Sequence, residues 1–290
     1  MLPRSAKEIT AFLAERGLAP LARFGQNFLV RDDVLQVMLA DAGDLSGTLV
    51  LEIGPGLGCL TRAVLDAGAE LVAAEVDAGF AEILRTEFAG EPRFHLVEGD
   101  CLAEGHPLAS ALWEALVERG VRTRGFRVLS NLPYQITSPF IAALAHLEVP
   151  PASAHLMLQR EVADVLRATP GTKNYTPLSL LAAFAFEVRL VQRVPASAFH
   201  PRPDVDSAIV ELRPRPKDPD LDALLEFGRA LLLGRRQVLR RTLPRALERG
   251  GAVVSKERID AALLKSGLTG SERAETLNPE IIRSLWRALR

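Results

Sequence analysis

The sequence predicts an α/β fold with a mostly parallel sheet of seven strands, followed by a small all-helical C-terminal domain. Between residues 48 and 159, short apolar segments alternate with helical segments, which is typical of a parallel sheet. The apolar segments are nearly continuous, which indicates that helices bury both faces of the sheet. From residue 221 on, only helical periodicity remains, and this change marks the second domain.

Two helices are expected before the sheet. Ser5 and Glu8 have the spacing of a capping box at the start of the first helix, and Gly17 ends it. The second helix covers about residues 32–42, where apolar side chains recur at helical spacing. The stretch between the two helices, residues 24–28, has an irregular pattern.

Five segments are predicted to form the parallel strands, and ligands bind at the carboxyl ends of such strands. They are residues 49–53, 71–74, 94–97, 127–130 and 155–158. Residues 187–194 and 205–212 predict two further strands, which are expected to pair as an antiparallel hairpin across a proline-rich connection.

A proline-rich run at residues 213–219 predicts a linker, because proline prevents both helix and central strand. We therefore predict one domain over residues 1–213 and a helical domain over residues 214–290. Its helices are expected near residues 221–233, 237–247, 256–266 and 279–289. Pro244 is expected to break the second of them or to start a new helix.

Composition and charge narrow the function classes. With 290 residues, 48% hydrophobic and 24% charged, the chain is typical of a globular protein. Its apolar runs are too short to span a membrane and no signal-like leader opens it, so we expect a cytoplasmic protein. Cys59 and Cys101 lack the spacing of a disulfide framework or zinc site and are expected to be buried small residues.

The charge is unevenly distributed along the chain. Residues 213–290 contain 17 Lys and Arg against 10 Asp and Glu, whereas residues 1–212 contain 18 against 26. This asymmetry favours a polyanionic partner for the second domain, although a solvated helical surface has the same composition.

A glycine-rich turn follows the first strand of the sheet, at Gly54-Pro55-Gly56-Leu57-Gly58. Glycines there let the backbone approach a ligand closely. Dinucleotide sites use the same turn, and a tight turn without a ligand is also compatible with it.

Carboxylates end the next two strands. Glu75 stands 21 residues after Gly54, where a carboxylate can accept both hydroxyl hydrogens of a ribose, although an exposed turn acid is the alternative. Asp100 ends the third strand and can accept a hydrogen bond from an adenine amino group. Together the strand ends predict a nucleoside cofactor, either S-adenosyl-L-methionine or NAD.

The fourth strand ends in Asn131-Leu132-Pro133-Tyr134, which resembles the N-P-P-Y-type motif of amino-methyltransferases that act on adenine N6. The N6 lone pair is delocalised into the purine ring, so acceptors must hold its hydrogens before the nitrogen can react. The side-chain oxygen of Asn131 and the carbonyl of Leu132 can accept them, Pro133 fixes the backbone, and Tyr134 offers a stacking face. The alternative is a buried loop with an aromatic plug.

With these motifs, the chain resembles the ribosomal RNA adenine dimethyltransferases, which modify adjacent adenines near the 3′ end of small-subunit RNA. The similarity covers most of residues 22–213. It is carried by residues 24–29, 52–58, 75–77, 99–100, 131–134, 158–162 and 199–207.

The resemblance implies a Rossmann-like class I methyltransferase that uses S-adenosylmethionine and no metal. The implied cofactor-binding residues are Gln26, Asn27, Leu29, Gly54, Gly56, Glu75, Val76, Asp100, Cys101 and Asn131. The implied catalytic residues are Asn131, Leu132, Pro133, Tyr134 and Phe199, the last lying across the target pocket. Apart from the resemblance, the second domain is expected to recognise RNA through Arg235, Arg236, Arg240 and Arg241, because arginines recur there at helical i, i+4 spacing and could follow a phosphate backbone.

It also implies the reaction and its setting. We expect methyl transfer to N6 of two adjacent adenines near the 3′ end of small-subunit RNA within a pre-ribosomal particle, by a monomeric protein. A large-subunit RNA methyltransferase of the antibiotic-resistance type and an RNA-binding assembly factor are the alternatives. A nicotinamide dehydrogenase is disfavoured, because no hydride-transfer His or Tyr–Lys arrangement accompanies the turn.

The chain departs from the family pattern at three positions. Cys101 replaces an alanine, Thr176 replaces a glycine, and Gln237 replaces a lysine. The second change predicts a different local turn, and the third puts one RNA contact in doubt.

Overall fold

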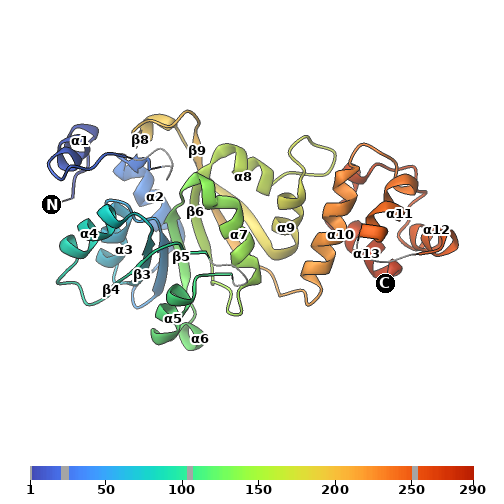
Figure 1. Cartoon of the computed structure of the whole chain (residues 1–290), viewed down its shortest axis with the longest axis horizontal. Coiled ribbons are helices and arrows are strands. Elements are labelled where there is room, and N and C mark those ends of the chain that lie inside the picture. Colours follow the sequence, from blue (N-terminus) through green and yellow to red (C-terminus); the bar gives the residue numbers. More distant parts are fainter. Residues whose placement is uncertain (1, 21–25, 103–106, 250–253) are drawn as a thin grey trace. The chain divides into compact units, whose positions relative to one another are not determined.

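The computed structural model describes residues 2–20, 26–102, 107–249 and 254–290 (Figure 1). The chain divides into two compact units, Met1–Ala163 with Arg189–Pro214 and Asp164–Val188 with Arg215–Arg290. The domain boundary predicted after residue 213 lies one residue from the point, after Pro214, where the chain passes from the first unit into the second. Residues 164–188 also belong to the second unit, and no change in composition marks this earlier boundary. The functions assigned to the two domains stay predictions.

The first unit is built around a sheet of seven strands, as predicted. In sheet order they are β4 (Phe94–Glu98), β3 (Glu70–Glu75), β2 (Leu49–Ile53), β5 (Arg127–Asn131), β6 (Ala154–Gln159), β9 (Ser207–Pro214) and β7 (Phe186–Val194). The first five are parallel, and β9 pairs antiparallel with β6. The two strands predicted to form a hairpin, β7 and β9, are neighbours in this sheet.

Helices cover the sheet and fill the connections between its parallel strands (Figure 1). They are α2 (Asp32–Ala42), α3 (Cys59–Asp66), α4 (Ala78–Glu87), α5 (Ser110–Glu118), α6 (Val121–Arg124), η2 (Tyr134–Ile136) and α7 (Thr137–His146). The apolar faces of α2 and α3 share one core cluster with strands of the sheet, through residues such as Met38, Val64 and Leu129. Burial of apolar surface stabilises a fold by about 25 cal/mol per Å², and this contribution holds the helices on the sheet.

The N-terminal helix α1 (Ala6–Ala14) begins with the predicted capping box between Ser5 and Glu8. Its buried Ile9 and Leu13 pack in a cluster with Phe28 and Phe80. After it, β1 (Phe28–Leu29) pairs antiparallel with β8 (Phe199–His200) in a small second sheet. The irregular stretch expected at residues 24–28 is described only from Gln26 on, and residues 24 and 25 lie outside the described residues.

The remaining elements, four of which lie where helices are predicted in the C-terminal part of the chain, are helical. They are α8 (Arg160–Leu166), α9 (Pro177–Ala185), η3 (Ala196–Ala198), α10 (Leu221–Leu233), α11 (Leu239–Arg249), α12 (Lys256–Lys265), η4 (Ala274–Thr276) and α13 (Pro279–Leu289). Of these, η3 belongs to the first unit and α8 lies across residue 163, where the chain passes into the second. In the described residues, no helix is both long and apolar enough to cross a bilayer.

The expectation that Pro244 ends a helix is wrong, because α11 continues through it. Proline in a helix removes one backbone hydrogen bond and crowds the preceding turn. The helix buries Leu239, Leu243 and Leu247 on one side, and this packing outweighs the loss.

Thr176, which replaces a family glycine, is the N-cap of α9. It forms a capping box with Ser179, and its φ of −134° is ordinary extended backbone. Thus the turn needs no glycine at this position.

Candidate functional site

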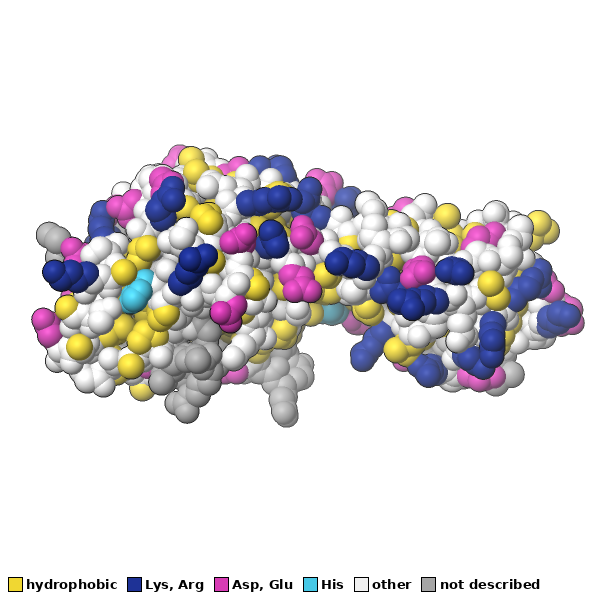
Figure 2. All heavy atoms as spheres, turned by 90° about the horizontal axis from the view of Figure 1, so that it is seen from above, with side chains coloured by type: hydrophobic (Ala, Val, Ile, Leu, Met, Phe, Trp, Pro, Cys, Tyr) yellow, Lys and Arg dark blue, Asp and Glu magenta, His cyan; other side chains and the backbone are white. Residues whose placement is uncertain are grey.

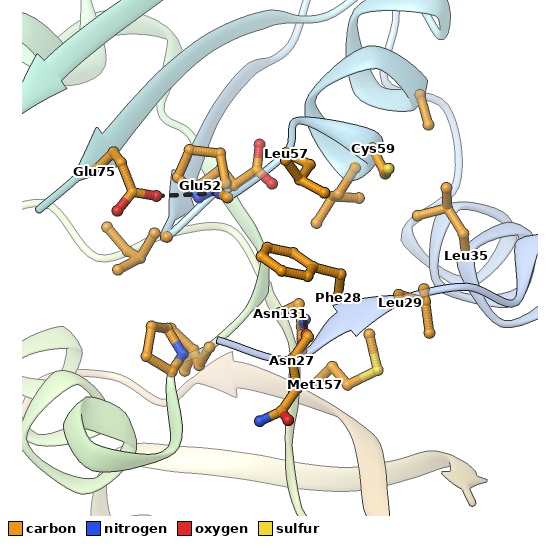
Figure 3. Close-up of a pocket in the computed structure, with 18 of the residues that line it drawn as sticks. Asn27, Phe28, Leu29, Leu35, Glu52, Leu57, Cys59, Glu75, Asn131 and Met157 are labelled. Atoms are coloured by element: carbon orange, nitrogen blue, oxygen red, sulfur yellow. Dashed lines mark hydrogen bonds between the residues drawn. The ribbon is translucent and has the colours of Figure 1, made fainter. Parts of the chain in front are cut away.

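A cavity of about 1030 Å³ opens at the carboxyl ends of β2, β3 and β5 in the first unit (Figure 3). It continues between α2 and α3 toward Leu35 and Cys59. All but one of the predicted cofactor and catalytic residues line it, namely Gln26, Asn27, Leu29, Gly54, Gly56, Glu75, Val76, Asp100, Cys101, Asn131, Leu132, Pro133 and Tyr134. Phe199 is the exception.

The glycine-rich turn lines this cavity, and its backbone favours glycine at Gly54 and Gly56. Gly54 has a φ of 65°, and a Cβ on it would lie 3.0 Å from Cγ of Pro133. Gly56 has a φ of 55°, and its Cβ would lie 3.2 Å from the ring of Phe28. The left-handed backbone and these close neighbours both favour glycine. The turn is therefore packed between the Asn131–Tyr134 loop and the segment around Phe28.

Glu75 ends β3 with its side chain only 5% exposed. Its carboxylate accepts hydrogen bonds from the backbone amides of Gly56, at 3.1 Å, and Asp77, at 2.9 Å. Burial raises its pKa, and the two amides oppose that shift. A carboxylate has about four acceptor positions, so two remain for the hydroxyls of a ribose.

The segment before β1 is tied to the same strand end. Nε2 of Gln26 donates to Oδ2 of Asp77 at 3.1 Å. Asp77 in turn caps α4 by accepting from the amides of Gly79 and Phe80. The segment that carries the implied cofactor-binding residues Asn27 and Leu29 is therefore held next to the end of β3.

Val76 and the residues after β4 also line the cavity. Val76 is 51% exposed, a high exposure for a branched apolar side chain. Asp100 accepts from the amide of Leu102 at 2.9 Å and is exposed, whereas Cys101 is buried beside it. Cys59, expected to be buried, is only partly so.

Glu52 is a lining residue that the sequence analysis did not single out. It lies in the middle of β2, is 2% exposed, and accepts a hydrogen bond from Oγ1 of Thr61 at 2.7 Å. Burial, reinforced by the negative charge of Glu75, raises its pKa to about 8. A charged residue type inside the otherwise apolar strand Leu49–Ile53 was the signal that could have identified it.

Asn131 ends β5 and lines the cavity beside Pro133 and Tyr134. Its Nδ2 donates to the carbonyl oxygen of Asn27 at 3.2 Å, and Figure 3 shows the two residues next to each other. A carbonyl can only accept, so this bond fixes which end of the amide is nitrogen. Oδ1 is left as the acceptor end of the side chain.

The rest of the loop is held by specific bonds. The backbone amide of Leu132 donates to the backbone carbonyl of Met157 at 3.0 Å. The side chain of Leu132 is buried. The hydroxyl of Tyr134 lies 2.8 Å from that of Ser207, at the start of β9. The loop that carries the predicted target-binding residues is therefore bonded to both β6 and β9.

Phe199, which the resemblance places across the target pocket, lies outside the lining of this cavity. Its side chain is 4% exposed and packs in the core cluster with residues such as Val194 and Ala198, and it is not among the lining residues. Pairing of β8 with β1 places Phe199 opposite Leu29, which turns its ring into this core.

Residues 21–278 match the ribosomal RNA adenine dimethylase family. The chain belongs to this family. Its predicted glycine turn, strand-end carboxylates and Asn131–Tyr134 loop are thus the motifs of a ribosomal RNA adenine dimethylase, gathered around one cavity.

Several curated relatives of this dimethylase are named ribosomal RNA small subunit methyltransferase A. The protein from Deinococcus radiodurans is 37% identical over 98% of this chain and 91% of its own length. That from Treponema denticola is 33% identical over 94% and 90%.

Solved structures agree on the fold. A dimethyladenosine transferase from Plasmodium falciparum superposes with a TM-score of 0.73 at 24% identity, covering 89% of this chain and 95% of that one. The 23S rRNA methyltransferase ErmE gives a TM-score of 0.62 at 26% identity, covering 91% and 99%.

The four arginines predicted to bind RNA fall into two classes. Arg235 donates to Glu275 at 2.8 Å and to the carbonyls of Thr172 and Lys173, and Arg240 pairs with Asp260. Arg236 and Arg241 are exposed, and neither has a carboxylate partner among the described residues. Lys and Arg side chains are spread over the face of this unit that Figure 2 shows.

Three residues of metal-ligating type also meet in the first unit, away from the cavity. The ligand atoms of Asp41, His155 and Glu211 lie within 4.8 Å of one another. The guanidinium of Arg189 donates to Glu211 at 2.8 Å and to Asp41 at 2.6 Å. An arginine thus supplies the positive charge that the two carboxylates require.

Proposed function

We propose that this dimethylase transfers methyl groups from S-adenosylmethionine to N6 of two adjacent adenines near the 3′ end of small-subunit ribosomal RNA. The product is N6,N6-dimethyladenosine. The observation that carries the proposal is the oriented amide of Asn131, which lines one cavity with the glycine turn and with Glu75.

The lining residues fit the cofactor chemically. The two remaining acceptor positions of Glu75 suit ribose hydroxyls, the exposed face of Val76 suits an adenine ring, and Asp100 suits its amino group. Gly54 and Gly56 present only backbone to the cavity, so the methionine part can approach the turn closely. When bound, the cofactor supplies the methyl group of its sulfonium, and the remaining sulfur becomes a neutral thioether.

The residues of the Asn131–Tyr134 loop prepare the target amine. Oδ1 of Asn131 and the carbonyl of Leu132 accept the two N6 hydrogens, which draws the lone pair out of conjugation with the purine. The ring of Tyr134 stacks on the base, and Pro133 fixes the spacing between the acceptors. The aminium formed is a strong acid and loses its proton to water. Positioning therefore accounts for most of the rate enhancement.

Two methylations at one nitrogen place a further demand on the loop. After the first transfer N6 keeps one hydrogen, so one acceptor holds it while the new methyl group occupies space beside the other. The same pocket can then present the lone pair a second time.

Support for the RNA substrate comes from the names of the curated relatives and from the excess of basic residues in 213–290. The proposal includes a pre-ribosomal particle as the substrate and a monomeric, cytoplasmic enzyme. Similarity to a 23S rRNA methyltransferase makes a large-subunit adenine the second candidate.

The test uses both ribosomal subunits, purified from cells that lack adenine dimethylation. The protein is incubated with each subunit and methyl-labelled cofactor, and modified bases are mapped by reverse transcription and mass spectrometry. We expect dimethyladenosine at two adjacent positions in small-subunit RNA, and none with Asn131→Ala. Label only in large-subunit RNA would establish the second candidate, and label in neither would contradict both.

A further inference from the structure

We propose that Ser207 is a positioning residue, which holds the ring of Tyr134 at the angle required for stacking on the target base. This inference rests on the function proposed above. It assigns a role to Ser207 at the start of β9, which is not part of the cavity lining and which has no assigned role of its own in the resemblance.

The contact itself is short and largely shielded from water. Oη of Tyr134 and Oγ of Ser207 lie 2.8 Å apart, with Ser207 0% exposed and Tyr134 partly buried. Buried hydroxyls almost always have a hydrogen-bond partner, and each of these two supplies one to the other. Burial raises the pKa of Tyr134, so its hydroxyl stays protonated and able to donate.

Ser207 is a rigid anchor because its backbone is held from two sides. It pairs with Gln159 in the ladder between β6 and β9. The preceding residue, Asp206, accepts from the amide of Arg160 with its carbonyl, at 2.9 Å, and from the amide of Ala196 with its carboxylate, at 3.0 Å. The hydroxyl of Ser207 therefore has a fixed position relative to the sheet.

Tyr134 is consequently held at both ends. Its backbone follows Pro133, which packs on Gly54, and its far end is bonded to Ser207. A phenylalanine ring at this position could stack equally well but could swing about its side-chain torsions. The tether thus converts a stacking surface into one of defined orientation, which matters because small misplacements of a reacting group reduce rates steeply.

The inference also explains residues 199–207 in this chain. The resemblance assigns this segment to the target pocket through Phe199, but that ring is buried in the core. In the structure the segment acts on the loop through its other end, where Ser207 meets Tyr134.

A double-mutant cycle tests the tether with Ser207→Ala, Tyr134→Phe and the combined variant, on undermethylated small subunits. Each single change should lower the single-turnover rate roughly 3- to 10-fold, the equivalent of one net hydrogen bond. The combined variant should be no slower than the slower single variant. Affinity for S-adenosylhomocysteine and KM for the subunits should stay at wild-type values, because neither change removes a binding surface.

Ser179→Ala is the matched control. Ser179 is a buried serine in the second unit whose hydroxyl donates to the carbonyl of Val165 at 2.7 Å. Its loss should lower the melting temperature without changing the rate, which separates loss of stability from loss of positioning.

The outcomes distinguish this inference from the proposed function. If wild-type protein is active and the two single effects multiply in the combined variant, or Ser207→Ala keeps the wild-type rate, the tether is refuted. If wild-type protein transfers no methyl group to either subunit, the proposed function fails first.

Discussion

Nδ2 of Asn131 donates a hydrogen bond to the main-chain carbonyl of Asn27, across 104 residues of sequence. Asn131 ends the central strand β5, and Asn27 lies in the segment before β1 that lines the cavity. Because the amide nitrogen is used in this way, the amide oxygen is the end available to a target amine. The bond therefore couples the position of the segment before β1 to the orientation of the acceptor.

Changing Asn131 to Ala should reduce methyl transfer far more than cofactor binding. Loss of a group that acts mainly in the transition state costs on the order of 10²-fold in rate. Loss of the single bond to Asn27 costs about 1 kcal/mol, or roughly fivefold in cofactor affinity. Single-turnover rates and calorimetric titration with S-adenosylhomocysteine measure the two effects. Wild-type turnover in this variant would refute the assignment of Asn131.

Glu75→Gln should show the opposite pattern, with weaker cofactor binding as the main effect. The variant keeps the shape of the side chain but replaces a buried charged acceptor by an amide. Hydrogen bonds to charged groups contribute about 1.5–3 kcal/mol, so affinity for S-adenosylhomocysteine should fall roughly 10- to 100-fold. Glu98→Gln is the control, since this carboxylate ends the adjacent strand and pairs with Arg85 instead. Equal affinities for wild type and Glu75→Gln would mean that the ribose binds elsewhere.

Much of the sheet and most of the cavity lining could be predicted because they are encoded locally. The parallel strands are short, mostly apolar segments, and the predicted and observed bounds differ by at most one residue, as in β3 (Glu70–Glu75). The strand ends carry short motifs whose residues must meet at one edge of a parallel sheet.

Features that depend on contacts between distant segments could not be predicted in this way. β1 and β8 are two residues each, too short for any periodicity, yet their pairing decides where Phe199 points. The bond between Tyr134 and Ser207 joins residues 73 apart, and nothing in either local sequence specifies it. The prediction at Pro244 is wrong because proline is a signal in the local sequence, whereas α11 is retained by packing against other parts of the unit.

Stability should depend on pH through Glu52. Burial raises its pKa in the folded protein from 4.5 to about 8, so the folded state keeps a proton that the unfolded chain releases. Between these values folded protein binds more protons than unfolded protein, and stability therefore falls as pH rises, by up to about 1.4 kcal/mol per pH unit. Glu52→Gln carries no titrating group and can still accept from Thr61.

Urea unfolding at pH 5, 6.5 and 8 measures this contribution. The free energy of unfolding of Glu52→Gln relative to wild type should rise between pH 5 and pH 8 by several kcal/mol at most. Glu114→Gln, which removes an exposed glutamate on α5, is the matched control. A constant difference between Glu52→Gln and wild type across this range would show that Glu52 is ionised in the folded protein.

The paired and unpaired arginines of the second unit should respond differently to substitution. Arg236→Gln and Arg241→Gln should each lower affinity for ribosomal RNA and reduce the slope of log affinity against log salt by about 0.7–0.9, one phosphate contact each. Their melting temperatures should not change, because both side chains are exposed. Arg235→Gln should instead cost roughly 1–3 kcal/mol of stability, since it leaves Glu275 and two carbonyls without their donor.

Filter-binding across a salt series, with melting curves for each variant, separates the two classes. Arg287→Gln on α13 is the control for charge alone, because this arginine is also exposed but lies on another helix. If it reduces the salt slope as much as Arg236→Gln does, the net charge of the unit governs RNA binding, and the segment from Arg236 to Arg241 has no special role. The continuity of α11 favours the local reading, since Arg241, Arg245 and Arg249 then follow one another by about 6 Å along a single helix face.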